Sequence, residues 1–543
     1  MSPSPHPANT PEITALKSLA APFHWLDQVP FSLIAGAFFV AVLGVYIRTA
    51  APSVLSGDSA EFQFAAPLLG VPHPTTYPLY ILLGKLTTLL VPVGEIAWRV
   101  TILSSLCGAL TALGCLVLVY RIGQSKPAAL LATLALSVAP GLWNAATIAE
   151  VYALLMLLLA TLILILTLMG PPTTVSLTNQ GTHPWRLYLS GFIAGLGCTH
   201  HGLFVLTALP LFATYILLLL IPRRLTLTAF ALLALCFVLG LTPLSYPLIQ
   251  FARYGPFDGV DVGLPTYYFW GAPTSWRAVF DLMTGGDVRR GIFQLPSIPE
   301  VVRVLHMVGN RLIFEFGPLG VLLGLVGAIS MFRYRRDVGI GLVWICLATS
   351  GYLLLLGPAV QDAPVFTLPI VLPWAVWIGM GGLTIASTCS DWLSASKGAP
   401  SVPLLSSILP IRVGQTILIV LIGVTLVWGY SRVSVSSKRH LWLFRDFGQA
   451  TLVALPSNAA VITHWEQGTI LHYLMAIEGQ RPDIEVVTVE PQDVNWGLVA
   501  EHYNADRPIF FIGSDESVAG LSVELVRADD YAQLFRFTAS TDE

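Results

Sequence analysis

The sequence predicts a polytopic α-helical membrane protein that ends in a small C-terminal α/β domain. Of its 543 residues, 55% are hydrophobic and only 11% are charged, whereas a soluble domain carries about 25% charged residues. Apolar runs such as 150–169 and 230–248 reach the roughly 20 residues that a helix needs to cross a bilayer. After residue 436, short β-rich runs alternate with helix-like stretches. Lipid is therefore the expected solvent for most of the chain.

The apolar runs predict about eleven transmembrane helices in a membrane domain of residues 30–430. The N-terminal segment 1–29 is polar and rich in proline, and it is too long to precede the apolar core of a cleaved signal peptide, so we expect the first span to be retained. The expected spans are 30–50, 98–120, 127–141, 149–169, 186–200, 202–221, 225–249, 312–332, 338–357, 366–387 and 412–430.

Positive charge predicts the orientation of these spans. If the N-terminus is cytoplasmic, the short outer turns near 142–148, 201 and 358–364 have no Lys or Arg. The connections on the cytoplasmic side then hold Arg121, Lys126, Arg186, Arg223, Arg224, Arg333, Arg335, Arg336, Lys397 and Arg412. The outer side would then hold a first loop, 51–97, a long loop, 250–311, and the C-terminal domain, 436–543. We expect a multi-pass protein of the cell (inner) membrane whose chemistry is extracytoplasmic.

Two function classes are disfavoured by composition. The net charge of -3 and the lack of a basic run with interleaved aromatic residues argue against nucleic-acid binding. The six cysteines lie in or beside apolar segments without the paired spacing of a zinc or redox site. They are expected to be small core residues.

The C-terminal domain is expected to alternate strands with helices. Its helix-like stretches are Glu466–Glu478 and Trp496–Tyr503. The expected strands are Ala460–Thr463, Ile484–Val489, Pro508–Ile512 and Gln533–Phe537.

One apolar segment of the first loop does not fit a span. Tyr77–Val91 is short, contains Lys85, and would reverse the charge asymmetry if it crossed the bilayer. We expect it to form a helix that lies along the outer membrane surface.

Two acids stand directly after the first span. Asp58 and Glu61 are three residues apart, so they share one face of a helix. One interpretation is structural, with Asp58 capping the helix and Glu61 in its first turn. The other interpretation is a general base at the bilayer surface. An acid near the membrane has an unfavourable free energy unless it is hydrated, so an acid at this place often has a function.

Further candidate residues fall on the same outer side. Glu150 begins the fourth span, where a helix N-terminus also favours an acid. The pair His200-His201 lies at an outer turn and fits either a structural or a proton-transfer role. Arginines in or at the end of the long loop could hold a phosphate with their forked guanidinium groups. They are Arg253, Arg277, Arg289, Arg290 and Arg311.

Four ordered motifs occupy the first 200 residues. They are Gly57-Asp58-Ser59-x-Glu61, His73-Pro74-x-x-Tyr77-Pro78, Ala97-Trp98-Arg99-Val100 and Ala149-Glu150-Val151-Tyr152. Their order resembles the GT-C membrane glycosyltransferases, and among these the bacterial relatives of the eukaryotic protein O-mannosyltransferase of the transmembrane-protein type. The chain differs from the usual sequence of this family at Thr75-Thr76, Ala60 and Ala272. These differences affect the expected identity of the acceptor more than the expected class of reaction.

The resemblance implies transfer of a sugar, mannose in the nearest relatives, from a polyprenyl-phosphate donor to a Ser or Thr hydroxyl of a secreted or membrane protein. Asp58 would be the base, Glu61 a second catalytic residue, and the anomeric carbon would be inverted. A phosphate with a second pKa of about 6 leaves without a protonating acid, so one carboxylate can suffice where glycosidases need two. No metal and no cofactor beyond the donor lipid are expected. The residues placed around the substrates are His73, Tyr77, Glu150, Tyr152, His200 and His201, with Arg277 or Arg289 on the lipid phosphate.

Two other readings remain open at this point. A multi-pass transporter has the same composition, although the spans carry few charges at mid-membrane and show no repeated half. A non-catalytic subunit of an envelope glycan assembly system would instead use the C-terminal domain to bind partners. It predicts that Asp58 is replaceable and that residues 436–543 are not.

Overall fold

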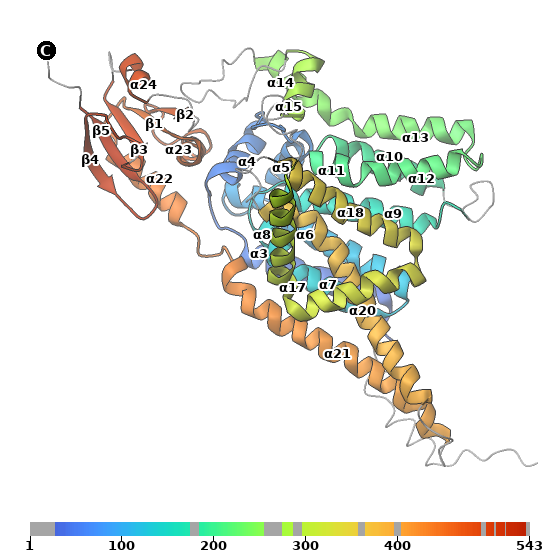
Figure 1. Ribbon diagram of the computed structural model, residues 1–543. Helices are drawn as coiled ribbons and strands as arrows, with labels where there is room; N and C mark the ends of the chain where they lie inside the picture. Colours follow the sequence, from blue (N-terminus) through green and yellow to red (C-terminus); the bar gives the residue numbers. More distant parts are fainter. Residues whose placement is uncertain are drawn as a thin grey trace, which may run out of the picture.

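The computed structural model shows a bundle of long helices with a five-stranded sheet at one end (Figure 1). The described residues are 28–173, 184–254, 274–285, 296–356, 364–395, 403–489, 496–503, 507–515 and 517–538.

The bundle is built from helices that run from the first span to the start of the sheet domain. They are α3 (Phe31–Thr49), α4 (Gly57–Leu68), α5 (Pro78–Leu90), α6 (Ile96–Gly123), α7 (Lys126–Val138), α8 (Pro140–Thr147), α9 (Tyr152–Met169), α10 (Pro184–Cys198), α11 (Gly202–Thr207), α12 (Leu209–Leu220), α13 (Leu227–Gly240), η1 (Thr242–Ser245), α14 (Tyr246–Tyr254), α15 (Trp276–Met283), α17 (Ile298–Tyr334), α18 (Arg336–Leu355), η2 (Pro364–Thr367), α20 (Leu368–Ala395) and α21 (Pro403–Ser436).

The membrane character predicted from composition is confirmed by these helices. Among the described residues, nine helical segments are long and apolar enough to cross a bilayer, and the number is ten if the bent pair α7 and α8 forms one span. Ten of the expected spans therefore have a counterpart. The remaining one, 186–200, is helix α10, which packs on α9 and α13 but has only 15 residues.

Glycines bring the two most extensively packed helices, α17 and α20, close together. A Cβ on Gly327 would lie 1.7 Å from the carbonyl oxygen of Trp377, and one on Gly381 would lie 2.0 Å from that of Leu323. Small residues let backbones approach in this way where no hydrophobic force drives helices together in lipid. The pair α17/α20 therefore depends on residues that have no side chain.

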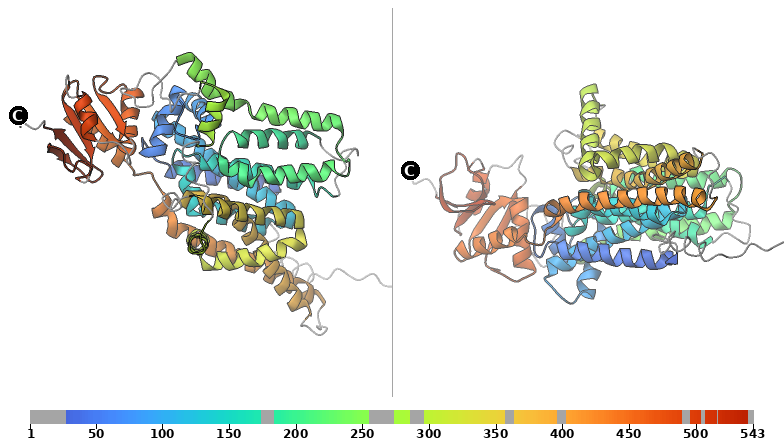
Figure 2. Two further views of the ribbon diagram at one scale, coloured as in Figure 1. Left: turned by 45° about the horizontal axis from the view of Figure 1, so that its top comes forward. Right: turned by 90° about the horizontal axis from the view of Figure 1, so that it is seen from below.

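Helix α17 is broken in its middle. Gly317 has a φ of 69° and is followed by Pro318, which cannot donate a helical hydrogen bond. Near this break, the indole Nε1 of Trp428 donates to the carbonyl oxygen of Glu315 at 3.2 Å. The first part of α17 therefore leaves the bundle at an angle to the second part (Figure 2).

The first loop forms two short helices, α4 and α5, that pack on each other and on α6. The expected helix between Tyr77 and Val91 is α5, which is apolar and has 13 residues. The Lys85 ammonium donates to the carbonyl oxygen of Pro67 at 2.5 Å, which explains how a charge is accommodated in this apolar segment.

The C-terminal part folds as a mixed sheet with helices, as the sequence predicts. The strand order is β2-β1-β3-β5-β4; β2, β1 and β3 are parallel, and β5 and β4 are antiparallel to their neighbours. Strand β4 was not expected. The elements are α22 (Leu443–Ala454), β1 (Ala460–His464), α23 (Trp465–Ala476), β2 (Glu485–Val489), α24 (Trp496–Tyr503), β3 (Ile509–Gly513), β4 (Val523–Ala528) and β5 (Gln533–Phe537).

The sheet domain is fastened to the first loop by polar contacts. Arg445 of α22 bonds Glu95 at 3.1 Å and Glu478 at 2.6 Å, and the backbone N–H of Ala97 donates to the Tyr473 hydroxyl at 3.0 Å. Helix α23 packs directly on α4. Figures 1 and 2 show the domain at the end of the bundle where α4 and α5 lie.

Candidate functional site

Asp58 lies at the start of α4 with its carboxylate accessible. The helix cap is Ser56, so the structural interpretation of Asp58 as the cap is wrong: Asp58 occupies the first turn. Its side chain is 45% exposed, and its Oδ1 lies 3.9 Å from Nε2 of His73. Asp58 is thus an exposed acid beside an imidazole.

Glu61, one helical turn further on, is fully buried and holds His73. Its Oε2 pairs with Nδ1 of the His73 ring, and its Oε1 accepts from the His73 backbone N–H at 3.1 Å. Because both carboxylate oxygens contact His73, this pairing fixes the ring so that its other nitrogen faces Asp58. Glu61 therefore has no free face for a substrate in this structure.

The charges of this cluster favour a protonated imidazole. Burial opposes the charged form of His73, but the neighbouring carboxylates of Glu61, Asp58 and Glu150 raise its pKa to about 9. Burial also raises the pKa of Glu61, so the pair retains a proton at neutral pH. The result is a cationic His73 next to the exposed Asp58.

Glu150 reaches the same cluster from the turn between α8 and α9. Its backbone N–H donates to the Ser104 hydroxyl at 3.2 Å, and that hydroxyl lies 3.0 Å from the Glu150 carbonyl oxygen. Burial, together with the charge of Asp58, raises the Glu150 pKa to about 8. Glu150 is therefore a protonated acid at neutral pH. It lies just before α9, which begins at Tyr152.

A row of aromatic rings connects the first loop with the rest of the site. His73 and Tyr77 have ring centroids 5.4 Å apart, and Tyr77 and His201 are 6.0 Å apart. His201 lies 5.3 Å from Tyr152, and Tyr152 lies 6.0 Å from Phe366 of η2. Residues from four separate parts of the sequence thus form one continuous row of neighbouring rings.

The two tandem histidines have structural contacts of their own. Nε2 of His200 lies 2.9 Å from the carbonyl oxygen of Val151, and Nδ1 of His201 accepts from the Leu203 backbone N–H at 3.0 Å. The first bond links the turn before α11 to the start of α9, and the second caps the N-terminus of α11. In the part of the chain that the structure describes, no group of three or more His, Cys, Asp and Glu side chains is arranged to hold a metal ion.

The expected phosphate-binding arginines differ in how far the structure describes them. Arg277 is exposed on α15, and Arg289 lies outside the described residues. A third cation, Arg311, lines a groove of about 390 Å³ together with Arg303 and His306 on α17. Thr367 also lines this groove and directly follows Phe366, the last ring of the aromatic row, in the sequence.

Arg311 is anchored on one side only. Its Nη2 bonds the buried Glu315 at 2.5 Å, whereas its buried Nε has no hydrogen-bond partner among the described residues. Glu315 in turn accepts from the backbone N–H of Gly141 at 2.9 Å. This network fixes Arg311 against the bundle.

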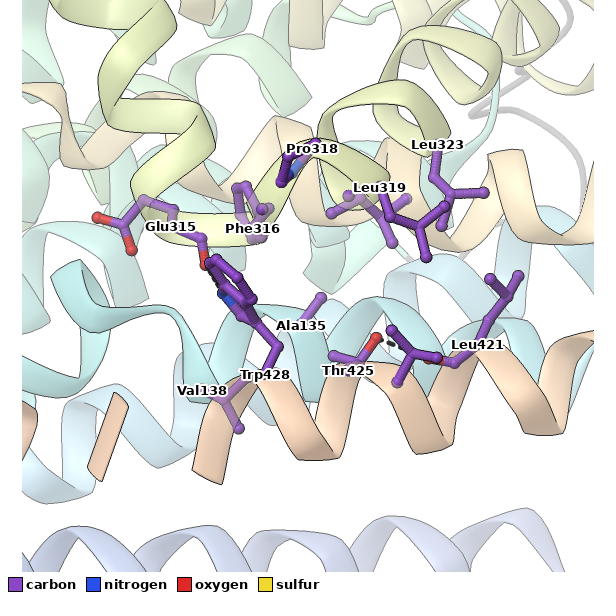
Figure 3. Close-up of a pocket in the computed structure, with 14 residues that line it drawn as sticks. Ala135, Val138, Glu315, Phe316, Pro318, Leu319, Leu323, Leu421, Thr425 and Trp428 are labelled. Atoms are coloured by element: carbon purple, nitrogen blue, oxygen red, sulfur yellow. Dashed lines mark hydrogen bonds between the residues drawn. The ribbon is translucent and has the colours of Figure 1, made fainter. Parts of the chain in front are cut away.

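An apolar cavity follows the groove along α17. It has a volume of about 80 Å³ and lies at the break of the helix, between α7, α20 and α21. In Figure 3 the Glu315 carboxylate points away from the apolar side chains that form this cavity. The labelled apolar lining residues are Ala135, Val138, Phe316, Pro318, Leu319, Leu323, Leu421 and Trp428.

Sequence reasoning missed the contribution of the C-terminal domain. The ring of Trp465, the first residue of α23, lies 5.7 Å from that of His73. Nothing in the local sequence singles out Trp465, because its proximity to His73 results from the docking of a domain nearly 400 residues further along the chain.

Residues 58–224 match the family model of the protein O-mannosyl-transferase TMEM260 N-terminal domain. Protein O-mannosyl-transferase TMEM260 of Mus musculus is 26% identical over 85% of this chain and 63% of its own length. The corresponding protein of Dictyostelium discoideum is 23% identical over 85% of this chain and 58% of its own length. The chain thus spans about three fifths of these relatives.

A solved structure shows the same fold over nearly the whole chain. ArnT from Cupriavidus metallidurans, in a crystal structure with undecaprenyl phosphate bound, superposes with a TM-score of 0.60 and is 14% identical over 96% of this chain and 99% of ArnT. The chain therefore has the fold of ArnT and is similar in sequence to the TMEM260-type protein O-mannosyltransferases.

Proposed function

We propose that the chain is a glycosyltransferase that moves mannose from a polyprenyl-phosphate donor to a Ser or Thr hydroxyl of a protein on the outer side of the membrane. The observation that carries the proposal is the position of Asp58, an exposed carboxylate at the edge of a cluster whose other acids are buried or protonated. The names of the relatives support the sugar and the class of acceptor.

Asp58 acts as the base of a single displacement. A carboxylate is too weak a base to ionise an alcohol beforehand, so the hydroxyl proton passes to Asp58 while the oxygen bonds the anomeric carbon. The bond from that carbon to the phosphate oxygen breaks in the same step, and the electron pair leaves with the phosphate. Attack opposite the leaving group inverts the anomeric configuration.

The other acids have supporting roles. Glu61 is a positioning residue, because it acts through His73 and has no exposed face. Protonated His73 keeps Asp58 oriented and partly neutralises it. Glu150, protonated at neutral pH, can donate a hydrogen bond to a sugar hydroxyl without adding a second negative charge near the departing phosphate.

The groove on α17 fits the donor phosphate better than Arg277 does. Arg303 and Arg311 supply two cations, and the Nε of Arg311 is a buried donor that lacks a described partner. The apolar cavity at Gly317 lies next along the same helix, where the lipid chain of the donor would continue. ArnT, which shares the fold, is seen with undecaprenyl phosphate bound.

The test is transfer of radiolabelled mannose from a short-chain polyprenyl-phosphate donor by the purified full chain, with mixed membrane and secreted proteins as acceptors. Protein labelling with inverted stereochemistry supports the proposal. A retained configuration contradicts the single displacement. If a folded preparation transfers no mannose, glucose or arabinose, the proposed function is wrong. A multi-pass transporter and a non-catalytic assembly subunit are then equally good alternatives.

A further inference from the structure

The C-terminal domain brings one side chain to the edge of the catalytic cluster. Trp465 contacts the site at two points: its ring lies 5.7 Å from the ring of His73, and its Cζ3 lies 3.4 Å from where a Cβ of Gly57 would be. Gly57 directly precedes Asp58 and has a φ of 58°, a conformation that favours glycine. Trp465 therefore covers the residue next to the base.

The indole of Trp465 has an unused hydrogen-bond donor. Its Nε1 is buried and has no partner among the described residues. Buried tryptophan N–H groups usually have a partner, since an unpaired one loses its hydration without compensation. The Cζ3 and Cη2 atoms of the indole face Gly57, so the N–H is on the opposite edge of the ring, where a ligand oxygen is its candidate partner.

The position of Trp465 also indicates which substrate it meets. The aromatic row runs from Trp465 through His73, Tyr77, His201 and Tyr152 to Phe366, and the cationic groove lies at the Phe366 end. Asp58, which takes the proton of the acceptor, is at the Trp465 end. The two substrates would thus enter the cluster from opposite ends.

We propose that Trp465 is a specificity-determining residue for the acceptor, and that its indole N–H donates to a carbonyl or hydroxyl oxygen of the acceptor polypeptide beside the reacting hydroxyl. This inference rests on the proposed function. It assigns the C-terminal domain a part in choosing the acceptor, in addition to covering the site.

The domain is held firmly enough for such a role. The ion pairs of Arg445 with Glu95 and Glu478 and the bond between Ala97 and Tyr473 fix α22 and α23 against the first loop. The ring of Phe64 lies 6.1 Å from that of His472, one further contact between α4 and α23. Trp465 is therefore positioned by contacts that do not involve its own indole.

The experiment compares Trp465→Phe and Trp465→Ala with the wild-type full chain, using as acceptor a Ser/Thr-containing peptide that the wild type labels. Phe keeps an aromatic ring and removes only the N–H. Loss of one hydrogen bond is expected to raise the KM for the peptide about ten-fold, and Ala raises it further. In both variants, the KM for the donor and the rate of donor hydrolysis without peptide should stay within about two-fold of the wild-type values. The matched control is Trp442→Phe, an exposed tryptophan of the same domain region.

Every outcome separates this inference from the proposed function. If the wild type transfers mannose and Trp465→Phe and Trp465→Ala leave the peptide KM unchanged, the inference is wrong and the function stands. If the donor KM rises as much as the peptide KM, Trp465 serves the donor or the fold, which also overturns the inference. If the wild type transfers nothing, the proposed function itself fails, and the inference fails with it.

Discussion

The pair formed by Glu61 and His73 is the most strongly buried ionisable contact of the first loop. Glu61 is completely buried and both of its oxygens contact His73. Burying two charged groups costs free energy, and this cost is offset only while the two groups remain paired with each other. The pair is thus a structural condition for the position of Asp58, which lies on the same helix.

His73→Ala is expected to destabilise the protein by about 3–5 kcal/mol, because the Glu61 carboxylate would remain buried without its partner. Thermal unfolding of the detergent-purified chain measures this. Glu61→Gln in the same background should restore part of the loss. The control His440→Ala changes an exposed histidine and should shift stability by less than about 0.5 kcal/mol. Equal effects of the two histidine variants would contradict the account.

Stability is expected to fall as pH rises toward 9. The pKa of His73 is raised from 6.5 to about 9 and that of Glu150 from 4.5 to about 8, so the folded state binds both protons more tightly than the unfolded chain does. The resulting stabilisation is complete below the unfolded pKa of each group and is lost as pH rises through the folded pKa. Melting temperatures between pH 5 and 9.5 test this. Glu150→Gln should flatten the curve below pH 8; an unchanged slope would argue against a raised pKa.

Single residues of the site could be predicted from sequence where they lie in local motifs. Asp58, Glu61, His73, Tyr77, Glu150, Tyr152 and the two histidines do converge. The burial of Glu61 could not be predicted, since it depends on the loop of His73 folding back onto α4. Trp465 was missed because its position follows from tertiary packing. Arg311 was among the candidate phosphate-binding arginines, but the groove that it lines also follows from tertiary packing.

At the level of elements, the contact of α17 with α20 depends on glycine. Gly327→Ala places a Cβ against the carbonyl of Trp377 and should cost about 1–3 kcal/mol, since neither backbone can move freely. The matched control is Gly309→Ala on the same helix, where nothing lies within 4 Å of the added Cβ. That change should be neutral or stabilising by about 0.5–1 kcal/mol. Equal melting temperatures for the two variants would contradict the packing described here.

Most elements follow from apolar length and alternation, and the exceptions have physical reasons. Helix α17 begins at Ile298, well before the expected start at 312, because Ser297 and Glu300 form a capping box that starts it within the long loop. Strand β4 was missed because its residues Val523–Ala528 are mostly exposed and include charges, so no apolar run marks it. Span 186–200 was expected from composition, yet its helix ends at Cys198 beside the histidine turn.

At the scale of the whole molecule, the candidate site lies where the bundle and the sheet domain meet. Arg445 is the central contact, because it joins Glu478 of the domain to Glu95 of the first loop. Arg445→Ala should loosen the domain and lower transfer several-fold, with a higher KM for the peptide. Faster proteolysis between α21 and α22 would show the loosening directly. The control Arg439→Ala changes an exposed residue and should neither lower transfer nor speed proteolysis. If Arg445→Ala loses transfer without faster proteolysis, Arg445 has a different role.

The most direct test of the whole account is Asp58→Asn beside wild type in the mannose transfer assay. The substitution keeps the size of the side chain and removes the base, so transfer should fall by about 10²-fold or more while the melting temperature stays within a few degrees. Asp446→Asn, an exposed acid on α22, serves as the control and should remain active. A fully active Asp58→Asn enzyme would remove Asp58 from the reaction and contradict the central claim.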